Sequence, residues 1–243
     1  MQKNIRQTRN RSLRTLTKRI VLIAFVSVSM QSFADPAQDV AAMESWRNGL
    51  YRKIAKSVVL IANKGHGTGF FVGPTLILTN AHVVGESQAV TVVTFGGHKL
   101  QAKVIEKAKK GYDLALIKVA DPKGLLKKPG GPVPLTLSTA PVHVGDWAAT
   151  IGHGTGIAQR ALTTLWSFNT GIVTNVYPSG KGSEVFETQI PVNPGNSGGP
   201  IFNKHGEVVG IATAGFKLAS SINFAIKVSV AKAHLRGLIA SGK

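Results

Sequence analysis

The sequence contains no cysteine among its 243 residues. This absence excludes a disulfide framework, a thiolate zinc site and a cysteine nucleophile, although it does not identify the compartment in which the protein works. Acidic residues are also scarce, since 11 Asp and Glu stand against 29 Lys and Arg, which gives a net charge of +18. Aromatic residues make up only 7% of the chain. The chain is therefore strongly basic and poor in aromatic residues, and the distribution of its positive charge bears on its possible partners.

Much of this positive charge lies at the N-terminus. Residues 1–34 contain seven Lys and Arg and no acidic residue, so that 22 basic and 11 acidic residues remain beyond them, a net charge of +11. These remaining charges are scattered, and no aromatic residues alternate with them as they do on a surface that stacks nucleic-acid bases. The pattern favours a solvated basic surface, and no nucleic acid is expected as a partner. A nucleic-acid or anionic-surface binder is the alternative that the charge alone suggests.

The N-terminal residues have the pattern of an export signal. A basic segment precedes the apolar run Ile20–Met30, which at 11 residues is too short to span a bilayer. Ser32 and Ala34 are the small residues that a signal peptidase reads. We therefore predict that residues 1–34 are a signal peptide, that the mature protein begins at Asp35 in the periplasm or outside the cell, and that it then has no stable membrane span. Because the basic segment is long, an inner-membrane anchor is the alternative.

The body of the chain is predicted to be rich in β-structure. It carries 27 Gly, 11 Pro and many short runs of Val, Ile and Thr, which are typical of short strands joined by tight turns. The glycine-rich segment 65–69 is expected to be a turn that leads into a strand at Phe70. Apolar residues at three- and four-residue steps predict a helix from Pro36 to about Lys56 and another over 229–240, with Ser229 as its N-cap.

Composition also suggests the order of the parts. Residues 121–145 are rich in Pro and Gly and are interpreted as a linker between two β units of similar size. The predicted organisation is a signal peptide, a helical segment, a first β unit, the linker, a second β unit and a closing helix: 1–34, 35–56, 57–120, 121–145, 146–228 and 229–243.

The segment Asn193–Pro200 has an unusual concentration of backbone-restricting residues. It places three glycines and two prolines around Ser197. Glycine allows a positive φ and the close approach of another backbone, while proline fixes φ. Such a loop can hold a hydroxyl outward while its own N–H groups converge on one point, as acyl transfer requires. A glycine-rich hairpin with an incidental serine is the alternative interpretation of this segment alone.

Two further positions are chemically distinctive. His82 follows directly after an apolar strand, and Asp113 opens the apolar run that continues to Ile117. A buried carboxylate is costly unless it is paired, and a histidine N–H is a suitable partner. Together with Ser197, these residues supply a nucleophile, a base that takes its proton and a carboxylate that orients the base.

The segments around these three residues resemble the catalytic signatures of trypsin-like serine proteases of the HtrA/Deg type. The signatures are Thr79–Val84, Asp113–Lys118 and Asn193–Pro200, in the order His, Asp, Ser. The resemblance continues in Gly67–Val72, Gly206–Ile211 and Ile222–Ile226, and it covers roughly residues 50–235.

The resemblance implies an all-β fold, a chymotrypsin-like double β-barrel, here with an N-terminal helix and a C-terminal helix. It also implies that His82 is the general base, that Asp113 orients it, and that Ser197 is the nucleophile. The backbone N–H groups of Gly195 and Ser197 would form the oxyanion hole. No cofactor is implied. The other histidines lack metal-ligand spacing; His66 and His153 occupy glycine-rich loops, either as turn residues or lining the cleft.

The resemblance extends to the substrate pocket. In this fold, the segment before the nucleophile and a strand that follows it form the walls of the primary pocket. No carboxylate occurs from residue 188 to 196, which favours aliphatic over basic side chains in the pocket. The predicted substrate-binding residues are Pro191, Val192, Asn193, Ala212, Thr213 and Ala214.

One departure from the family pattern concerns its additional domains. HtrA-type proteases commonly carry PDZ domains after the protease unit, and the resemblance here is to the protease unit without PDZ. Trp46 and Tyr51 would suit an oligomer contact or the packing of the N-terminal helix equally well, so the oligomeric state is left open. The sequence thus predicts a serine endopeptidase that acts on protein or peptide substrates. The alternative is a catalytically silent, protease-like binding protein.

Overall fold

The structure is a computed structural model that describes residues 36–109, 111–121, 124–154, 165–177, 180, 183–213 and 223–240. The predicted signal peptide, residues 1–34, lies outside these ranges, and so does Ala214. Among the described residues, no helix is both long and apolar enough to cross a membrane.

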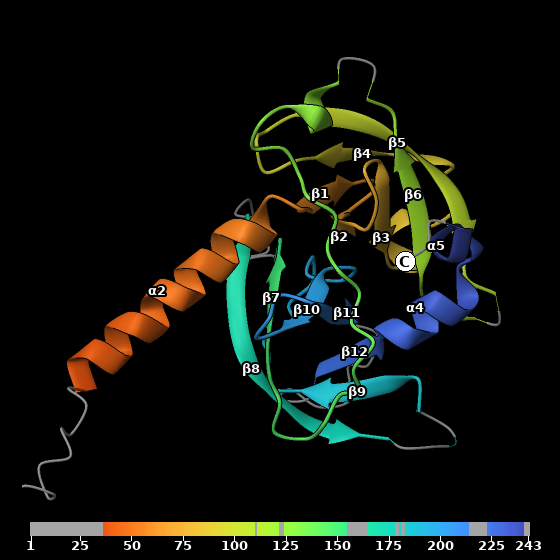
Figure 1. Ribbon diagram of the computed structural model, residues 1–243. Coiled ribbons are helices and arrows are strands. Elements are labelled where there is room, and N and C mark those ends of the chain that lie inside the picture. The colour runs from red at the N-terminus through yellow and green to blue at the C-terminus, as the bar shows by residue number, and fades with distance from the viewer. Residues whose placement is uncertain are drawn as a thin grey trace, which may run out of the picture. The chain divides into compact units, whose positions relative to one another are not determined.

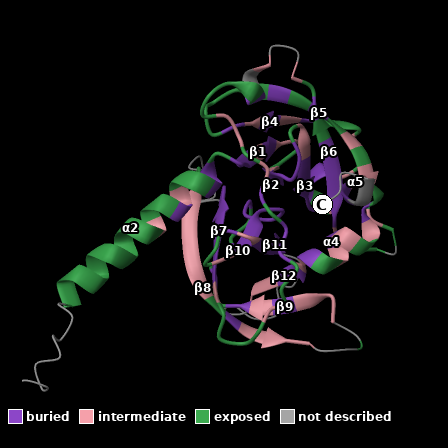
Figure 2. Ribbon diagram, viewed as in Figure 1, coloured by how far each residue is buried: buried purple, intermediate pink, exposed green. Residues whose placement is uncertain are grey.

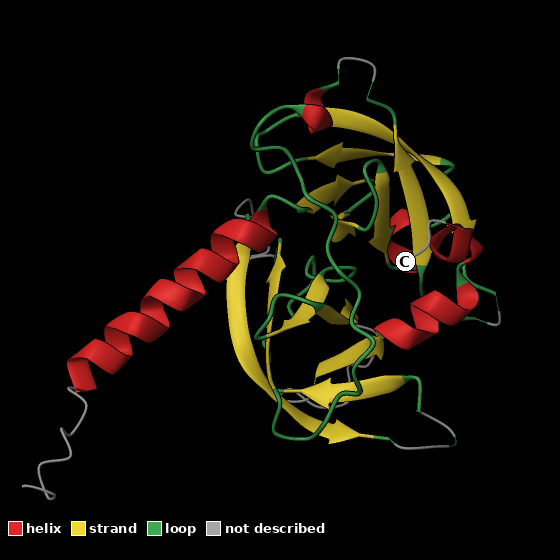
Figure 3. Ribbon diagram, in the orientation of Figure 1, coloured by secondary structure: helices red, strands yellow, loops and turns green. Residues whose placement is uncertain are grey.

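The described strands form two closed antiparallel barrels (Figures 1 and 3). The first contains β1 (Val58–Ala62), β2 (His66–Phe71), β3 (Leu76–Thr79), β4 (Ala89–Val93), β5 (Lys99–Lys107) and β6 (Ala115–Val119). The second contains β7 (Trp147–Gly152), β8 (Ser167–Val176), β9 (Val185–Thr188), β10 (Pro200–Asn203), β11 (Val208–Thr213) and β12 (Asn223–Lys227).

Strand order is β1-β2-β3-β6-β5-β4 in the first barrel and β10-β11-β12-β9-β8-β7 in the second. A short 3₁₀ turn, η1 (Leu125–Lys127), lies in the connection between the barrels. Helices are present near both ends of the chain: α2 (Pro36–Ala55) before the first barrel, and α4 (Val228–His234) and α5 (Arg236–Ala240) after the second. The expected all-β double barrel with terminal helices is thereby confirmed.

Burial along the strands explains how the barrels pack (Figure 2). Strand β5 buries Leu100 and Ala102 while their neighbours face solvent, the alternation of a strand with one wet face. Every residue of β11 is buried, so this strand has apolar contacts on both faces. Each barrel has its own interior cluster, and a third cluster joins residues of both barrels, including Phe70, Leu116 and Ile211.

The helix α2 begins at a proline, which the first helical turn tolerates because its N–H has no intrahelical partner. Near its C-terminal end, Leu50 and Ile54 are buried in the cluster that joins the barrels. Tyr51 makes an edge-to-face contact with Phe168, with ring centroids 6.0 Å apart. The packing role suggested for Tyr51 therefore has a concrete partner.

The predicted turn at 65–69 is wrong, because the structure places most of it within strand β2. Here glycine is needed for close packing rather than for a turn. A Cβ at Gly67 would lie 2.6 Å from the Val83 side chain, and one at Gly69 would lie 2.8 Å from that of Ile77. The strand thus approaches the segment that carries His82 more closely than a side chain would allow.

The single closing helix predicted over 229–240 is also wrong. The structure has two helices, α4 and α5, separated by Leu235 in an extended conformation, and Lys227 rather than Ser229 is the N-cap. Glu106 of β5 accepts hydrogen bonds from the backbone N–H groups of Arg236 and Gly237, both at 2.8 Å. The Glu106 carboxylate bonds to the N–H groups at the start of α5, which have no partner within that helix. Because Leu235 is buried in the core, the helix is interrupted at this residue.

Candidate active site

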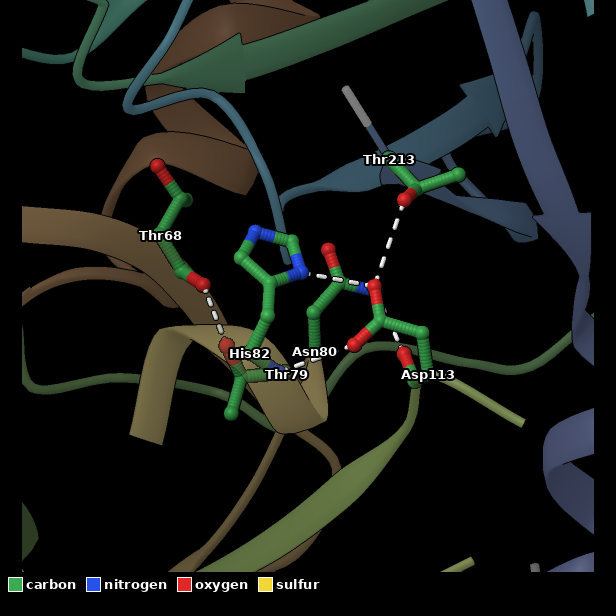
Figure 4. A network of polar contacts seen from close by, with 6 residues as sticks. All are labelled: Thr68, Thr79, Asn80, His82, Asp113 and Thr213. Carbon is green, nitrogen blue, oxygen red and sulfur yellow. Dashed lines mark hydrogen bonds and ion pairs between the residues drawn. The ribbon is translucent and has the colours of Figure 1, made fainter. Parts of the chain in front are cut away.

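His82 and Asp113 lie at the end of the first barrel and are joined by two hydrogen bonds (Figure 4). His82 lies in the one-turn helix α3 (Ala81–Val84), directly after β3, and Asp113 lies just before β6. The ring Nδ1 of His82 is 2.7 Å from Asp113 Oδ2, and the backbone N–H of His82 donates to Asp113 Oδ1 at 2.9 Å. One carboxylate therefore holds both the main chain and the ring of the histidine.

Two neighbours fix the aspartate in turn. The Asn80 side-chain amide donates to the Asp113 carbonyl at 2.7 Å, and the Thr213 hydroxyl donates to Asp113 Oδ2 at 3.3 Å. Tyr112, the preceding residue, stacks on the ring of His234 from α4, with centroids 4.3 Å apart. These contacts tie Asp113 and its neighbour Tyr112 to both barrels and to helix α4.

The electrostatics of the pair favour an ionised carboxylate. Burial alone raises the pKa of Asp113, but the hydrogen bonds from the His82 ring and backbone, the His82 charge and the Thr213 hydroxyl outweigh it. Its pKa is therefore lower than usual. The side chain of His82 is 49% exposed, against 30% for Asp113. The histidine is thus accessible from solvent while the group that orients it is partly shielded.

Ser197 lies in the loop between β9 and β10 and is only 4% exposed. The loop is shaped by Gly195 and Gly198, whose φ values of +98° and +84° are in the region that favours glycine. Its main chain reaches the other barrel, because the N–H of Thr68 in β2 donates to the Ser197 carbonyl at 2.9 Å.

The contacts of Gly198 bring the loop next to the histidine segment. A Cβ built on Gly198 would lie 2.2 Å from the Thr68 carbonyl oxygen, 2.3 Å from Thr79 Oγ1 and 3.0 Å from the backbone nitrogen of Asn80. Asn80 is two residues before His82. The loop that carries Ser197 is therefore packed directly against the segment that leads to His82, and only glycine fits at this contact.

The six residues predicted to bind substrate occupy varied environments. Pro191 and Asn193 are exposed, whereas Val192 is buried in the interior cluster of the second barrel. Ala212 is buried in β11 and exchanges backbone hydrogen bonds with the serine loop, and Thr213 directs its hydroxyl at Asp113. Ala214 lies outside the described residues.

Sequence reasoning missed a polar cluster behind the serine loop. Thr68 Oγ1 donates to the Gly195 carbonyl at 2.7 Å and is 3.1 Å from Nδ1 of His153, while His66 Nε2 is 3.1 Å from the His153 carbonyl. His153 is fully buried, and its ring packs edge-on against Trp166 at 4.7 Å. The sequence singles out His66 and His153 only as residues of glycine-rich segments, and the structure places His66 in strand β2. Thr68 and the contacts among the three residues have no periodic signal in the sequence. Across the described residues, no group brings together three or more His, Asp or Glu that could hold a metal ion.

Comparison with known proteins identifies the family. A model of the trypsin-like peptidase domain matches residues 67–211, and the chain belongs to this family. A protein of Rhizobium meliloti named "Probable periplasmic serine endoprotease DegP-like" is 33% identical over 216 residues, which cover 87% of this chain and 40% of that protein. The serine protease HTRA1A of Danio rerio is 35% identical over 187 residues, which cover 73% and 35% of the two chains.

A solved structure also has a fold similar to that of this chain. The crystal structure of the serine endoprotease from Yersinia pestis superposes with a TM-score of 0.63 at 25% identity, covering 81% of this chain and 67% of the other. The resemblance to HtrA-type proteases found in the sequence is confirmed. The chain spans less than half the length of the curated relatives it matches.

Burial of His153 leads to a prediction about acid stability. Burial, together with the charge of neighbouring His66, lowers the pKa of His153 from 6.5 to about 3. Between these values the unfolded state binds more protons than the folded state, so stability rises with pH through this window and is lost on acidification. We expect His153→Asn to reduce the loss of unfolding free energy between pH 7 and pH 4 by about 3 kcal/mol.

The measurement is urea unfolding of each protein at the two pH values. The control is His205→Asn, because His205 is exposed in the turn between β10 and β11 and its substitution removes a histidine away from the buried cluster around His153. An equal loss of stability in the wild type and His153→Asn would contradict a buried neutral histidine.

Proposed function

We propose that the protein is a serine endopeptidase in which Ser197, His82 and Asp113 form the catalytic triad. The observation that carries the proposal is the two-point attachment of His82 to Asp113, at 2.7 and 2.9 Å, beside the loop that bears Ser197. A carboxylate bound to Nδ1–H keeps the proton on that nitrogen and leaves Nε2 to accept one from a nucleophile.

The reaction follows from these roles. Ser197 Oγ attacks the peptide carbonyl carbon as His82 Nε2 takes the hydroxyl proton, and the N–H groups of Gly195 and Ser197 stabilise the oxyanion. When the intermediate collapses, His82 returns the proton to the amine and the C–N bond breaks, leaving an acyl-enzyme. Water, deprotonated by His82, then attacks the acyl carbon. The ester bond to Ser197 Oγ breaks, the acid leaves, and His82 returns the proton to Ser197 Oγ. Asp113 remains ionised throughout, in keeping with its lowered pKa.

The alternative function is a protease-like binding protein without turnover. A binding role requires neither an aspartate that orients a histidine nor a glycine that allows the serine loop to pack beside it. The close packing at Gly198 and the bonds to Asp113 therefore favour a working enzyme.

The substrates we propose are unfolded or exposed segments of proteins, and the place of action is the periplasm or the cell exterior. The predicted signal peptide supports export, and the Rhizobium meliloti relative is named a periplasmic endoprotease.

Covalent labelling tests the proposed activity. We expect a fluorophosphonate probe to label the wild type on Ser197, and we expect Ser197→Ala and His82→Ala each to lower kcat on casein by roughly 10⁴-fold or more. Ser138→Ala is the matched control, because Ser138 is similarly buried and bonds to Glu207 instead. A folded wild type that neither reacts with the probe nor cleaves casein would support the silent alternative.

Substrate preference gives a second prediction. A Lys or Arg side chain in an uncharged pocket would lose hydration without a partner, at a cost of roughly several kcal/mol, whereas an aliphatic side chain gains roughly 1.5–3 kcal/mol. We expect cleavage mainly after Val, Ala, Ile or Leu, mapped by mass spectrometry on an unfolded protein. Ser197→Ala controls for contaminating proteases. A majority of cuts after Lys or Arg would refute this pocket assignment.

A further inference from the structure

Thr68 makes an unusual set of bonds to the serine loop. Its backbone N–H donates to the Ser197 carbonyl at 2.9 Å, and its hydroxyl donates to the Gly195 carbonyl at 2.7 Å. Its own carbonyl accepts the Thr79 hydroxyl at 2.7 Å. One residue of the first barrel therefore holds the carbonyls of both residues whose N–H groups we assign to the oxyanion hole.

The direction of the hydroxyl hydrogen follows from counting donors. A hydroxyl has one hydrogen, and on Thr68 it is used by the bond to Gly195. The backbone N–H of His153 at 3.2 Å and its ring Nδ1 at 3.1 Å must then both donate to Thr68 Oγ1. His153 is therefore the Nδ1–H tautomer, and its buried Nε2, which has no hydrogen-bond partner among the described residues, is the unprotonated nitrogen.

These bonds fix two peptide groups of the loop at both ends. The Gly195–Asn196 peptide is held at its oxygen by Thr68 and at its N–H by the Asn193 carbonyl, at 2.9 Å. The Ser197–Gly198 peptide is held at its oxygen by Thr68 and at its N–H by the Ala212 carbonyl, also at 2.9 Å.

The peptide between these two carries the N–H of Ser197. Its oxygen accepts the Gly199 N–H at 3.0 Å, and in a trans peptide the N–H points the opposite way. With both neighbouring peptides fixed, this group cannot rotate without breaking bonds to Thr68. Gly195 is confined as well, since a Cβ there would lie 2.2 Å from the His153 carbonyl oxygen.

We propose that Thr68 is a positioning residue for the oxyanion hole, and that His153 orients its hydroxyl for this role. Thr68 does not touch the reacting atoms; it acts by holding the Gly195 and Ser197 carbonyls away from the substrate side. The inference rests on the proposed peptidase activity and adds to it a determinant outside the triad.

The test compares Thr68→Val, which keeps the shape and removes the hydroxyl, with Thr68→Ser, which keeps the hydroxyl. Thr94→Val is the matched control, because Thr94 is also a buried threonine of the first barrel and its hydroxyl accepts a backbone N–H at 3.2 Å, from His98. We expect Thr68→Val to lower kcat on a peptide substrate by about 10- to 100-fold with KM changed less than about threefold, since one oxyanion donor accounts for roughly 10²–10³-fold.

Thr68→Ser should recover most of the lost kcat, and Thr94→Val should retain wild-type kcat. Equal kcat in Thr68→Val and Thr94→Val, or a loss that serine does not restore, would overturn the proposal. Circular dichroism melts ensure that each variant is compared below its unfolding transition.

If Thr68→Val does not fold, variants of His153 test whether the Thr68 hydroxyl positions the oxyanion hole. The amide of His153→Asn can replace the Nδ1–H donor, whereas His153→Leu cannot. We expect the asparagine variant to keep kcat and the leucine variant to lose it, and equal kcat in the two would overturn the proposal. A wild type that is folded but unreactive toward fluorophosphonate would instead refute the peptidase function on which the inference rests.

Discussion

The contact between strand β2 and the loop Asn193–Pro200 is the constraint on which the arrangement of the site depends. β2 pairs with β3 through backbone groups at Phe70 and Phe71; at Thr68, β3 contributes only the Thr79 hydroxyl, which bonds to the Thr68 carbonyl, so the backbone N–H of Thr68 has no partner in β3. The serine loop takes that place through the N–H and hydroxyl of Thr68. The polar groups at this edge would otherwise need water as a partner, and the loop of the second barrel bonds to them instead.

Asp113 has a comparable role on the opposite side of His82. Its carboxylate accepts bonds from the first barrel through His82 and from the second through Thr213, at the end of β11. The preceding strand residue, Ala212, bonds to both Gly198 and Gly199 of the serine loop. A displacement of β11 would therefore disturb the aspartate and the serine loop together, so both depend on how the barrels pack.

The strands and the triad candidates could be predicted because each has a local signal. Short β-branched runs mark strands, and the sequences around His82, Asp113 and Ser197 are specific to a known family. The glycines of β2 predict a turn from the sequence alone, because the contacts that require them, with Val83 and Ile77, exist only in the folded protein. The helix break before Arg236 likewise depends on Glu106, which lies 130 positions earlier in the chain than the residue it binds.

Thr68 and His153 could not have been assigned from the sequence for the same reason. They are 85 positions apart, and the role proposed for each residue depends on its bond to the other and on the bond to the Gly195 carbonyl. Thr213 shows a related limit: its strand predicts a pocket residue, and only the structure shows that its hydroxyl also bonds to Asp113. The local sequence shows which side chains are present in a segment, whereas hydrogen bonds between residues far apart in the chain determine the role of each side chain.

The most direct test of this account is a pair of glycine substitutions, Gly198→Ala and Gly97→Ala. Both glycines have a left-handed φ, +84° and +78°, so both substitutions incur a similar backbone strain of about 1 kcal/mol. A Cβ at Gly97 meets nothing within 4 Å, whereas one at Gly198 would collide with Thr68 and Thr79.

The measurement is the rate of fluorophosphonate labelling at a temperature at which both variants are folded. If the packing of the serine loop against β2 positions the nucleophile, Gly198→Ala should label at least about tenfold more slowly than Gly97→Ala, which should match the wild type. Equal labelling rates for the two folded variants would contradict the account.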